Sequence, residues 1–188
     1  MKQTGKNIVV AVALLVALGG FGWRAGAQQV ALRSNALRAA LLTPDLGVEL
    51  VSGEHSSVSL SVFGNWKPYG IDSKLIAVQP QFRWWFNGRP LVREYVGVAA
   101  LFTDYDIGWG ERRYRGLAGG LGLTGGYVLP LGTRWGVEFS GGLGFVLFSQ
   151  HRGSRYDNFD YLDGGAYTSR GYKILPMNVG VTFIYIIK

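Results

Sequence analysis

The chain has 188 residues, a formal net charge of +7 and no cysteine; 48% of its residues are hydrophobic and only 16% are charged. This composition excludes a disordered or collagen-like chain, and the lack of cysteine excludes disulfides, thiol chemistry and zinc–thiolate sites. The basic residues are scattered along the chain rather than gathered into a run, so we expect no nucleic-acid partner.

The first 27 residues have the three parts of a secretory signal peptide. Lys2 and Lys6 precede an apolar run over residues 8–18, and small residues at positions 25–27 end the segment. The apolar run is shorter than the roughly 20 residues that a transmembrane helix needs. We therefore expect export, cleavage after Ala27 and one mature domain over residues 28–188, any membrane spans of which must be strands.

Eight segments of the mature chain alternate apolar residues with small or polar ones, which is the two-residue period of a β-strand. In chain order we predict strands over residues 30–42, 45–52, 57–66, 75–86, 95–103, 115–129, 135–148 and 175–187. The first of these segments also fits a short amphipathic helix, although we take it as a strand. The last segment places Leu175 and Met177 on the same apolar face as Phe183.

The connections between these segments alternate in length. Short ones cover residues 53–56, 87–90 and 130–133, and long polar ones cover residues 67–74, 104–114 and 149–170. Short turns at one end and long loops at the other are typical of a membrane barrel. We therefore predict an all-β fold, an eight-stranded antiparallel up-and-down transmembrane β-barrel in the outer membrane.

The second face of the predicted strands helps to choose between a membrane barrel and a soluble one. It carries mainly Gly, Ser, Thr, Asn and Gln with a few isolated charges, whereas a water-facing sheet usually carries Lys, Glu and Asp. This composition favours a crowded lumen. The alternative is a soluble sandwich or a lipocalin-like barrel whose apolar face points inward.

Several short stretches add a resemblance to a known family. They are LRSN at residues 32–35, TPDLGVE at 43–49, VQPQFRWW at 78–85 and GVE at 136–138. The chain resembles a Bacteroidetes family of small outer-membrane β-barrel proteins known as a domain of unknown function, over nearly the whole mature chain. The resemblance implies the fold and the location but no activity, and it points to a surface or fimbrial protein as the partner to consider.

Five polar residues fall on the inward faces of the predicted strands: Glu49, Gln79, Gln81, Arg83 and Glu138. An eight-stranded barrel is narrow enough for side chains to fill its lumen, and charges removed from water need partners. We expect these residues to form a structural ion-paired plug, with a gate or proton-linked site as the alternative.

Glycine dominates the inward faces of residues 115–129 and 135–148, so something must fill the space that the missing side chains leave. Phe63, Trp85 and Phe148 are the candidates for this bulk. The alternative is a small apolar or lipid-sized pocket in the lumen.

Aromatic residues gather near the predicted strand ends: Trp66, Trp84, Tyr127, Trp135 and Tyr185. Indole and phenol rings suit the headgroup boundary of a bilayer, so we expect these residues to form interfacial girdles.

The long loops carry the candidate contact residues Trp109, His151, Arg152, Arg155, Tyr156 and Tyr161. Because binding residues concentrate on loops held by a rigid scaffold, we expect a non-catalytic structural or accessory surface protein. Its loops would bind another envelope component, and its wall would contact outer-membrane lipid. The sequence does not give the oligomeric state, and a monomer is the default. We expect no catalytic residue, cofactor or metal. Two alternatives stay open: a lipid-modifying enzyme that uses His151 with Ser149 or Ser154, and a barrel that binds or passes a small apolar ligand.

Overall fold

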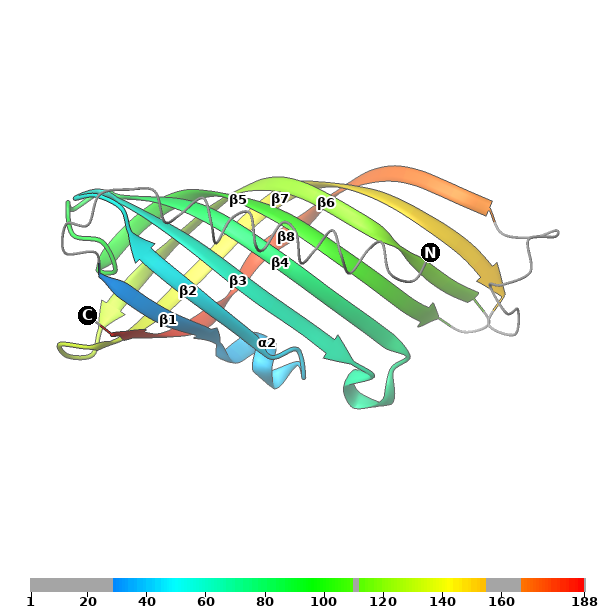
Figure 1. The fold of residues 1–188 in the computed structure, drawn as a ribbon, viewed down its shortest axis with the longest axis horizontal. Coiled ribbons are helices and arrows are strands. Elements are labelled where there is room, and N and C mark those ends of the chain that lie inside the picture. The colour runs from blue at the N-terminus through cyan, green and yellow to red at the C-terminus, as the bar shows by residue number, and fades with distance from the viewer. Residues whose placement is uncertain (1–28, 110–111, 155–166, 188) are drawn as a thin grey trace.

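A computed structural model describes residues 29–109, 112–154 and 167–187 of the chain. These residues form eight strands (Figure 1): β1 (Val30–Asn35), β2 (Asp45–Val51), β3 (Ser56–Trp66), β4 (Ser73–Trp85), β5 (Arg93–Trp109), β6 (Arg112–Pro130), β7 (Trp135–Ser154) and β8 (Tyr167–Ile186). The short helix α2 (Ala36–Ala40) follows β1, and the 3-10 helix η2 (Pro68–Gly70) lies between β3 and β4. The export segment predicted over residues 1–27 lies outside the described residues.

The strands close into a barrel. Each strand pairs antiparallel with its neighbours in the chain, and β8 pairs with β1 to complete the ring. This confirms the all-β, eight-stranded, antiparallel up-and-down barrel. No helix in the described ranges is both long and apolar enough to cross a membrane.

The two ends of the barrel differ. At the turn end, short turns join β2 to β3, β4 to β5 and β6 to β7, and the last described residues of the chain lie there too (Figure 1). At the opposite hairpin end, β5 to β8 extend far beyond β1 and β2, because the former have 17–20 residues and the latter six and seven. The wall of the barrel is therefore tall on one side and short on the other.

The predicted strand over residues 30–42 is wrong in its second half. The strand ends at Asn35, whose side chain accepts hydrogen bonds from the amides of Leu37 (3.0 Å) and Arg38 (3.1 Å). This is an N-cap, and it begins the helix that the sequence offered as the second interpretation of this segment.

Two of the predicted long loops are also too long. β5 continues to Trp109 and pairs with β6 from Arg112, and the pairing of β7 with β8 continues to Arg152 and Tyr167. Much of residues 104–114 and 149–170 is therefore strand. The apolar alternation that marks a half-buried strand vanishes where both faces are polar, yet the backbone still pairs.

Alternate residues of each strand face opposite sides of the wall. Large apolar side chains are exposed on the outside, among them Leu46, Val98, Leu121, Leu123, Phe139, Leu143, Phe145, Ile174, Val179 and Phe183. We call this outer surface the apolar belt. Polar side chains are buried on the inside, among them Arg33, Glu49, Ser57, Ser59, Gln81, Arg83, Thr124, Glu138 and Thr182. The polarity of the barrel is thus the reverse of that of a water-soluble one.

A β-bulge in β8 changes which residues face inward. The register shifts between Gly142, which pairs with Asn178, and Leu143, which pairs with Pro176, so Met177 is an extra residue. Its side chain is turned inside and buried, and Leu175 beyond it pairs with the inward Gly144. The prediction that Leu175 and Met177 share the outer face with Phe183 is therefore wrong, because a bulge reverses the alternation.

The Met177 side chain fills the space left by two inward glycines. A Cβ atom added at Gly144 would lie 1.7 Å from the Met177 sulfur, and one added at Gly122 would lie 2.5 Å from it. Of the three residues expected to supply bulk, Phe148 covers Gly171. Trp85 lies in an apolar cluster at the turn end, and Phe63 lies beneath the Arg38 guanidinium.

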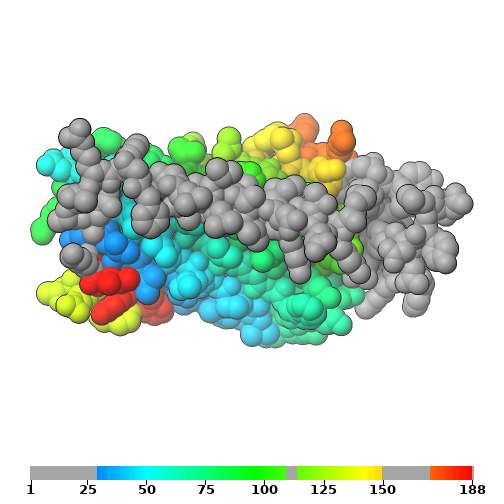
Figure 2. All heavy atoms as spheres, viewed as in Figure 1, coloured from blue at the N-terminus to red at the C-terminus, as the bar shows by residue number. Residues whose placement is uncertain are grey.

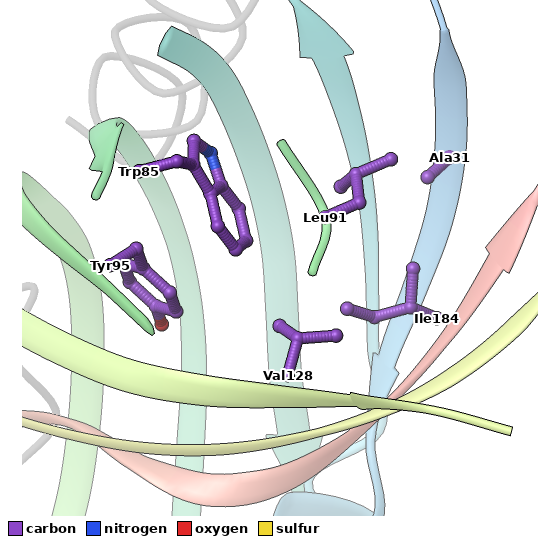
Figure 3. Close-up of a cluster of buried hydrophobic side chains, with 6 residues drawn as sticks. All are labelled: Ala31, Trp85, Leu91, Tyr95, Val128 and Ile184. Carbon is purple, nitrogen blue, oxygen red and sulfur yellow. The ribbon is translucent and has the colours of Figure 1, made fainter. Parts of the chain in front are cut away.

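That apolar cluster fills the lumen at the turn end. Its buried members are Ala31, Trp85, Leu91, Tyr95, Val128 and Ile184 (Figure 3). Leu91 comes from the β4–β5 turn and takes a left-handed backbone conformation, φ 66°, which is unfavourable for leucine. Burial of its side chain offsets this cost. Through Leu91, the β4–β5 turn helps to fill the lumen at the turn end.

Candidate functional site

Four charged side chains from four strands meet inside the barrel. We call them the charge cluster: Arg33 on β1, Glu49 on β2, Arg83 on β4 and Glu138 on β7. Each occupies an inward position of its strand, and none is more than 5% exposed. The formal charges of the four cancel.

Each arginine of the charge cluster contacts both glutamates. Arg83 Nη1 lies 3.1 Å from Glu49 Oε2 and 2.9 Å from Glu138 Oε2. Arg33 Nη1 lies 3.3 Å from Glu49 Oε2, and Arg33 Nη2 lies 2.6 Å from Glu138 Oε2. Because β7 is far from β2 and β4 around the ring, these contacts brace opposite walls of the barrel.

The carboxylate oxygens that face away from the arginines also have partners. The Ser57 hydroxyl donates to Glu49 Oε1 and accepts a hydrogen bond from the Trp85 indole. The Tyr95 hydroxyl donates to Glu138 Oε1 at 2.8 Å. The charge cluster is therefore joined to the apolar cluster beneath it through Trp85 and Tyr95.

The side of the charge cluster that faces the hairpin end of the lumen is polar as well. Arg83 Nη2 donates to Gln81 Oε1 at 2.8 Å, and the Gln81 amide donates to the Thr124 hydroxyl. The Nε atoms of Arg33 and Arg83 are buried and have no hydrogen-bond partner in the structure. Buried ion pairs of this kind contribute little net stability, but removing one partner is costly.

A second polar layer lies between the charge cluster and the hairpin end. Arg38 of α2 pairs with Asp45 at 3.4 Å, donates to Gln79 Oε1 at 2.9 Å and covers the ring of Phe63 at 3.9 Å. The Gln79 amide in turn donates to the Met177 carbonyl at 3.1 Å. Side chains therefore cross the lumen at two levels.

A cavity of about 10 Å³ separates these two layers. Its lining is Arg33, Asn35, Arg38, Asp45, Ser61, Gln79, Gln81, Arg83, Asn178 and Thr182. This volume is about that of a single water site, and the lining supplies ample polar partners. The cavity thus differs from the apolar pocket that a hydrophobic ligand would need.

A larger, open hollow of about 610 Å³ lies against the hairpin-end part of β5 to β8. Its walls include Phe102, Leu117, Leu147 and Tyr172, which occupy outward positions of their strands. Its lining also includes Thr103, Ala118, Phe148 and Gly171, which occupy inward positions, so the hollow touches both faces of this part of the wall. Among the described residues, no group of three or more His, Asp or Glu side chains is placed to hold a metal ion.

The structure brings together all five of the polar residues that the sequence placed in the lumen: Glu49, Gln79, Gln81, Arg83 and Glu138. Sequence reasoning missed Arg33, Arg38 and Tyr95 as their partners. The inward position of Tyr95 follows from the alternation of residues 95–103 and could have been found. Arg33 and Arg38 lie in the segment whose strand-or-helix choice was ambiguous, so their directions could not be assigned.

The predicted girdle residues lie on the outer face of the barrel. Trp84, Tyr127, Trp135 and Tyr185 lie near the turn end, and Trp66 is at the hairpin end of β3. The Trp135 and Tyr185 rings contact each other with centroids 4.8 Å apart, and the Trp84 ring stacks on His55. Aromatic residues therefore border the apolar belt at both ends.

The predicted loop contacts fall largely beyond what the structure describes. Arg155, Tyr156 and Tyr161 lie outside the described residues. Trp109 ends β5, so it is not in the middle of a loop, and His151 and Arg152 belong to the hairpin-end part of β7. The side chains of these three are also outside the described part of the structure.

Comparison with known protein families gives a match. The model of a family described as "Protein of unknown function (DUF3575)" matches residues 10–187. Searches of curated proteins and of solved structures gave no match.

The charge cluster predicts a large difference between two Glu→Gln substitutions. Glu138→Gln leaves Arg33 and Arg83 with one carboxylate between them, so we expect it to lower the free energy of unfolding by about 3–5 kcal/mol. The matched control, Glu94→Gln, removes an exposed pair with Arg93 and should change the free energy of unfolding by less than about 1 kcal/mol. Urea unfolding in detergent micelles measures both, and equal effects of the two substitutions would contradict the account.

Proposed function

The chain belongs to the DUF3575 family of proteins of unknown function, and we propose that it is a small, non-catalytic outer-membrane barrel. In this proposal the protein is exported, inserts as a monomer and is sealed to solutes. Its tall β5–β8 wall projects from the membrane and binds another component of the envelope or cell surface.

The observation that carries the membrane part of the proposal is the reversed polarity of the wall. Leu123 on the outside is 71% exposed, whereas Glu138 inside is fully buried. A soluble protein rarely exposes so broad an apolar surface, but lipid requires one. Closure of the sheet also fits a bilayer, because it leaves no strand edge along the fully paired part of the wall. The aromatic residues that border the apolar belt further support this interpretation.

The filled lumen supports a sealed barrel rather than a pore. The apolar cluster around Trp85 closes the turn end, and the charge cluster braces opposite walls just above it. A solute would have to displace both sets of side chains. The barrel is therefore suited to anchoring and presenting a surface.

The outer face of the tall wall changes character toward the hairpin end, which supports a role in binding. From the level of Leu117 and Tyr172 toward the hairpin end, the outward positions include the charged residues Asp104, Asp106, Arg115 and Arg170. Mixed charges on a rigid, projecting sheet can contact a folded partner. Among the described residues, no comparable observation favours a lipid-modifying enzyme.

The membrane proposal predicts that lysine substitutions at two exposed leucines differ in their effect on stability. Leu123→Lys places a charge in the middle of the apolar belt, and we expect it to lower the free energy of unfolding in vesicles by about 2–4 kcal/mol. Leu131→Lys lies in a short turn beyond the belt and should change it by less than about 0.5 kcal/mol. The heat-dependent shift of the folded barrel on a detergent gel reports the unfolded fraction. A soluble barrel would tolerate both substitutions equally.

The binding proposal predicts where cross-links to a partner form in intact cells. A photo-reactive phenylalanine analogue placed at Arg115 or Arg170 should yield a cross-linked protein of one defined mass. The same analogue at Leu121, within the apolar belt, is the matched control and should yield none. Cross-links of equal yield at all three positions, or none at any, would refute a partner-binding role for the tall wall.

A further inference from the structure

The strands of the barrel wall leave a gap on its short side. β1 pairs with β8 only as far as Asn35 and Thr182, although β8 extends on to Tyr167. β2 begins opposite Phe63, and β3 extends three residues further to Trp66. Between β8 and the end of β3, the wall consists of residues 36–44, which include α2 (Figure 1).

This gap lies within the apolar belt rather than beyond its edge. On one side of it, the outer face of β8 is still apolar at Val179 and Ile174, and both side chains are exposed. On the other side, Val62 of β3 is likewise exposed, and the gap ends at Trp66, which borders the belt. Whatever covers the outer face of the neighbouring strands must therefore also reach α2.

Much of the backbone of residues 36–44 is hydrogen-bonded. The Asn35 side chain accepts from the amides of Leu37 and Arg38, and the amides of residues 41–43 donate to carbonyls of the helix. The Tyr69 hydroxyl donates to the Ala40 carbonyl, and the Gly64 amide donates to the Pro44 carbonyl. Backbone in hydrocarbon needs such pairing, whereas loops in water can bond to solvent instead.

The side chains of this segment are sorted by polarity. Arg38 points into the barrel toward Asp45 and Gln79. Leu37, Leu41 and Leu42 are exposed, Leu41 to 57%. The three leucines extend the outward row formed by Leu32 and Leu46 on the adjoining strands, so they continue the apolar belt.

Leu42 gives an independent sign that this surface is covered. Its φ is 50°, a left-handed conformation that follows the helix end and that glycine adopts far more readily. The Thr43 amide donates to the Arg38 carbonyl and the Leu42 amide to the Ala39 carbonyl, as in the common glycine-terminated helix end. A leucine that is strained yet exposed has no benefit in water, whereas contact with an apolar phase would offset the strain.

We propose that residues 36–44 form a helical section of the membrane-embedded wall, with Leu37, Leu41 and Leu42 in contact with lipid acyl chains. This inference rests on the proposed membrane location. The segment meets η2 at the molecular surface (Figure 2), where the Tyr69 hydroxyl donates to the Ala40 carbonyl. It closes the wall where β1 and β2 are too short to do so.

Spin labels on single cysteines test the proposal, since the chain contains no cysteine of its own. Leu37→Cys and Leu41→Cys carry the label in α2, Leu123→Cys marks the apolar belt and Leu131→Cys marks the aqueous turn. Each variant is reconstituted in phosphatidylcholine vesicles, and its folding is checked by the heat-dependent gel shift. Collision rates with oxygen, which concentrates in lipid, and with a water-soluble nickel chelate are then measured.

We expect the labels in α2 to show the high oxygen and low nickel collision rates of the label at Leu123. Nickel collision rates as high as those at Leu131 would overturn the proposal while leaving the barrel in the membrane. Low collision rates with both reagents would show that protein covers α2, such as a second copy of the chain, and would also overturn it. A water-like label at Leu123 would instead refute the membrane location itself.

Discussion

The burial of two arginines and two glutamates is the constraint on which the rest of the structure depends. Arg33, Glu49, Arg83 and Glu138 come from four strands, and each loses its water on folding, so each must reach an opposite charge. Because side chains alternate along a strand, a slip by one residue would move a charge to the outer face and a leucine to the lumen. The charge cluster therefore sets the register of the barrel even though it contributes little net stability.

This arrangement divides the molecule into two parts with different tasks. The part of the barrel toward the turn end is filled by the charge cluster and by the apolar cluster around Trp85, so it is rigid and closed. Its outer face then carries mainly apolar side chains and bordering aromatic residues, which suits a bilayer. The hairpin-end part of the tall β5–β8 wall lies beyond these two clusters. Its outward positions include charged residues. A sealed anchor beneath an exposed sheet is the physical basis of the proposed function.

Most of the barrel could be predicted from sequence, because apolar alternation indicates any strand that has one apolar and one polar face. The same alternation placed Glu49, Arg83 and Glu138 in one lumen before any contact was known. Alternation gave the wrong result where a local feature interrupts the strand. The Asn35 cap ends β1 and begins α2, and the bulge at Met177 exchanges the inward and outward positions of β8. Alternation also failed in the polar hairpins, where both faces are alike and a paired strand resembles a loop.

Quenching of two adjacent tryptophans by brominated lipid tests the alternation of the wall most directly. Trp84 faces outward and Trp85 is buried in the lumen, so neighbours in the chain should occupy different phases. Each would be kept as the sole tryptophan, with the others replaced by phenylalanine, in vesicles with and without brominated chains. The account predicts strong quenching of Trp84 and little of Trp85. Equal quenching of both, or quenching of neither, would contradict it.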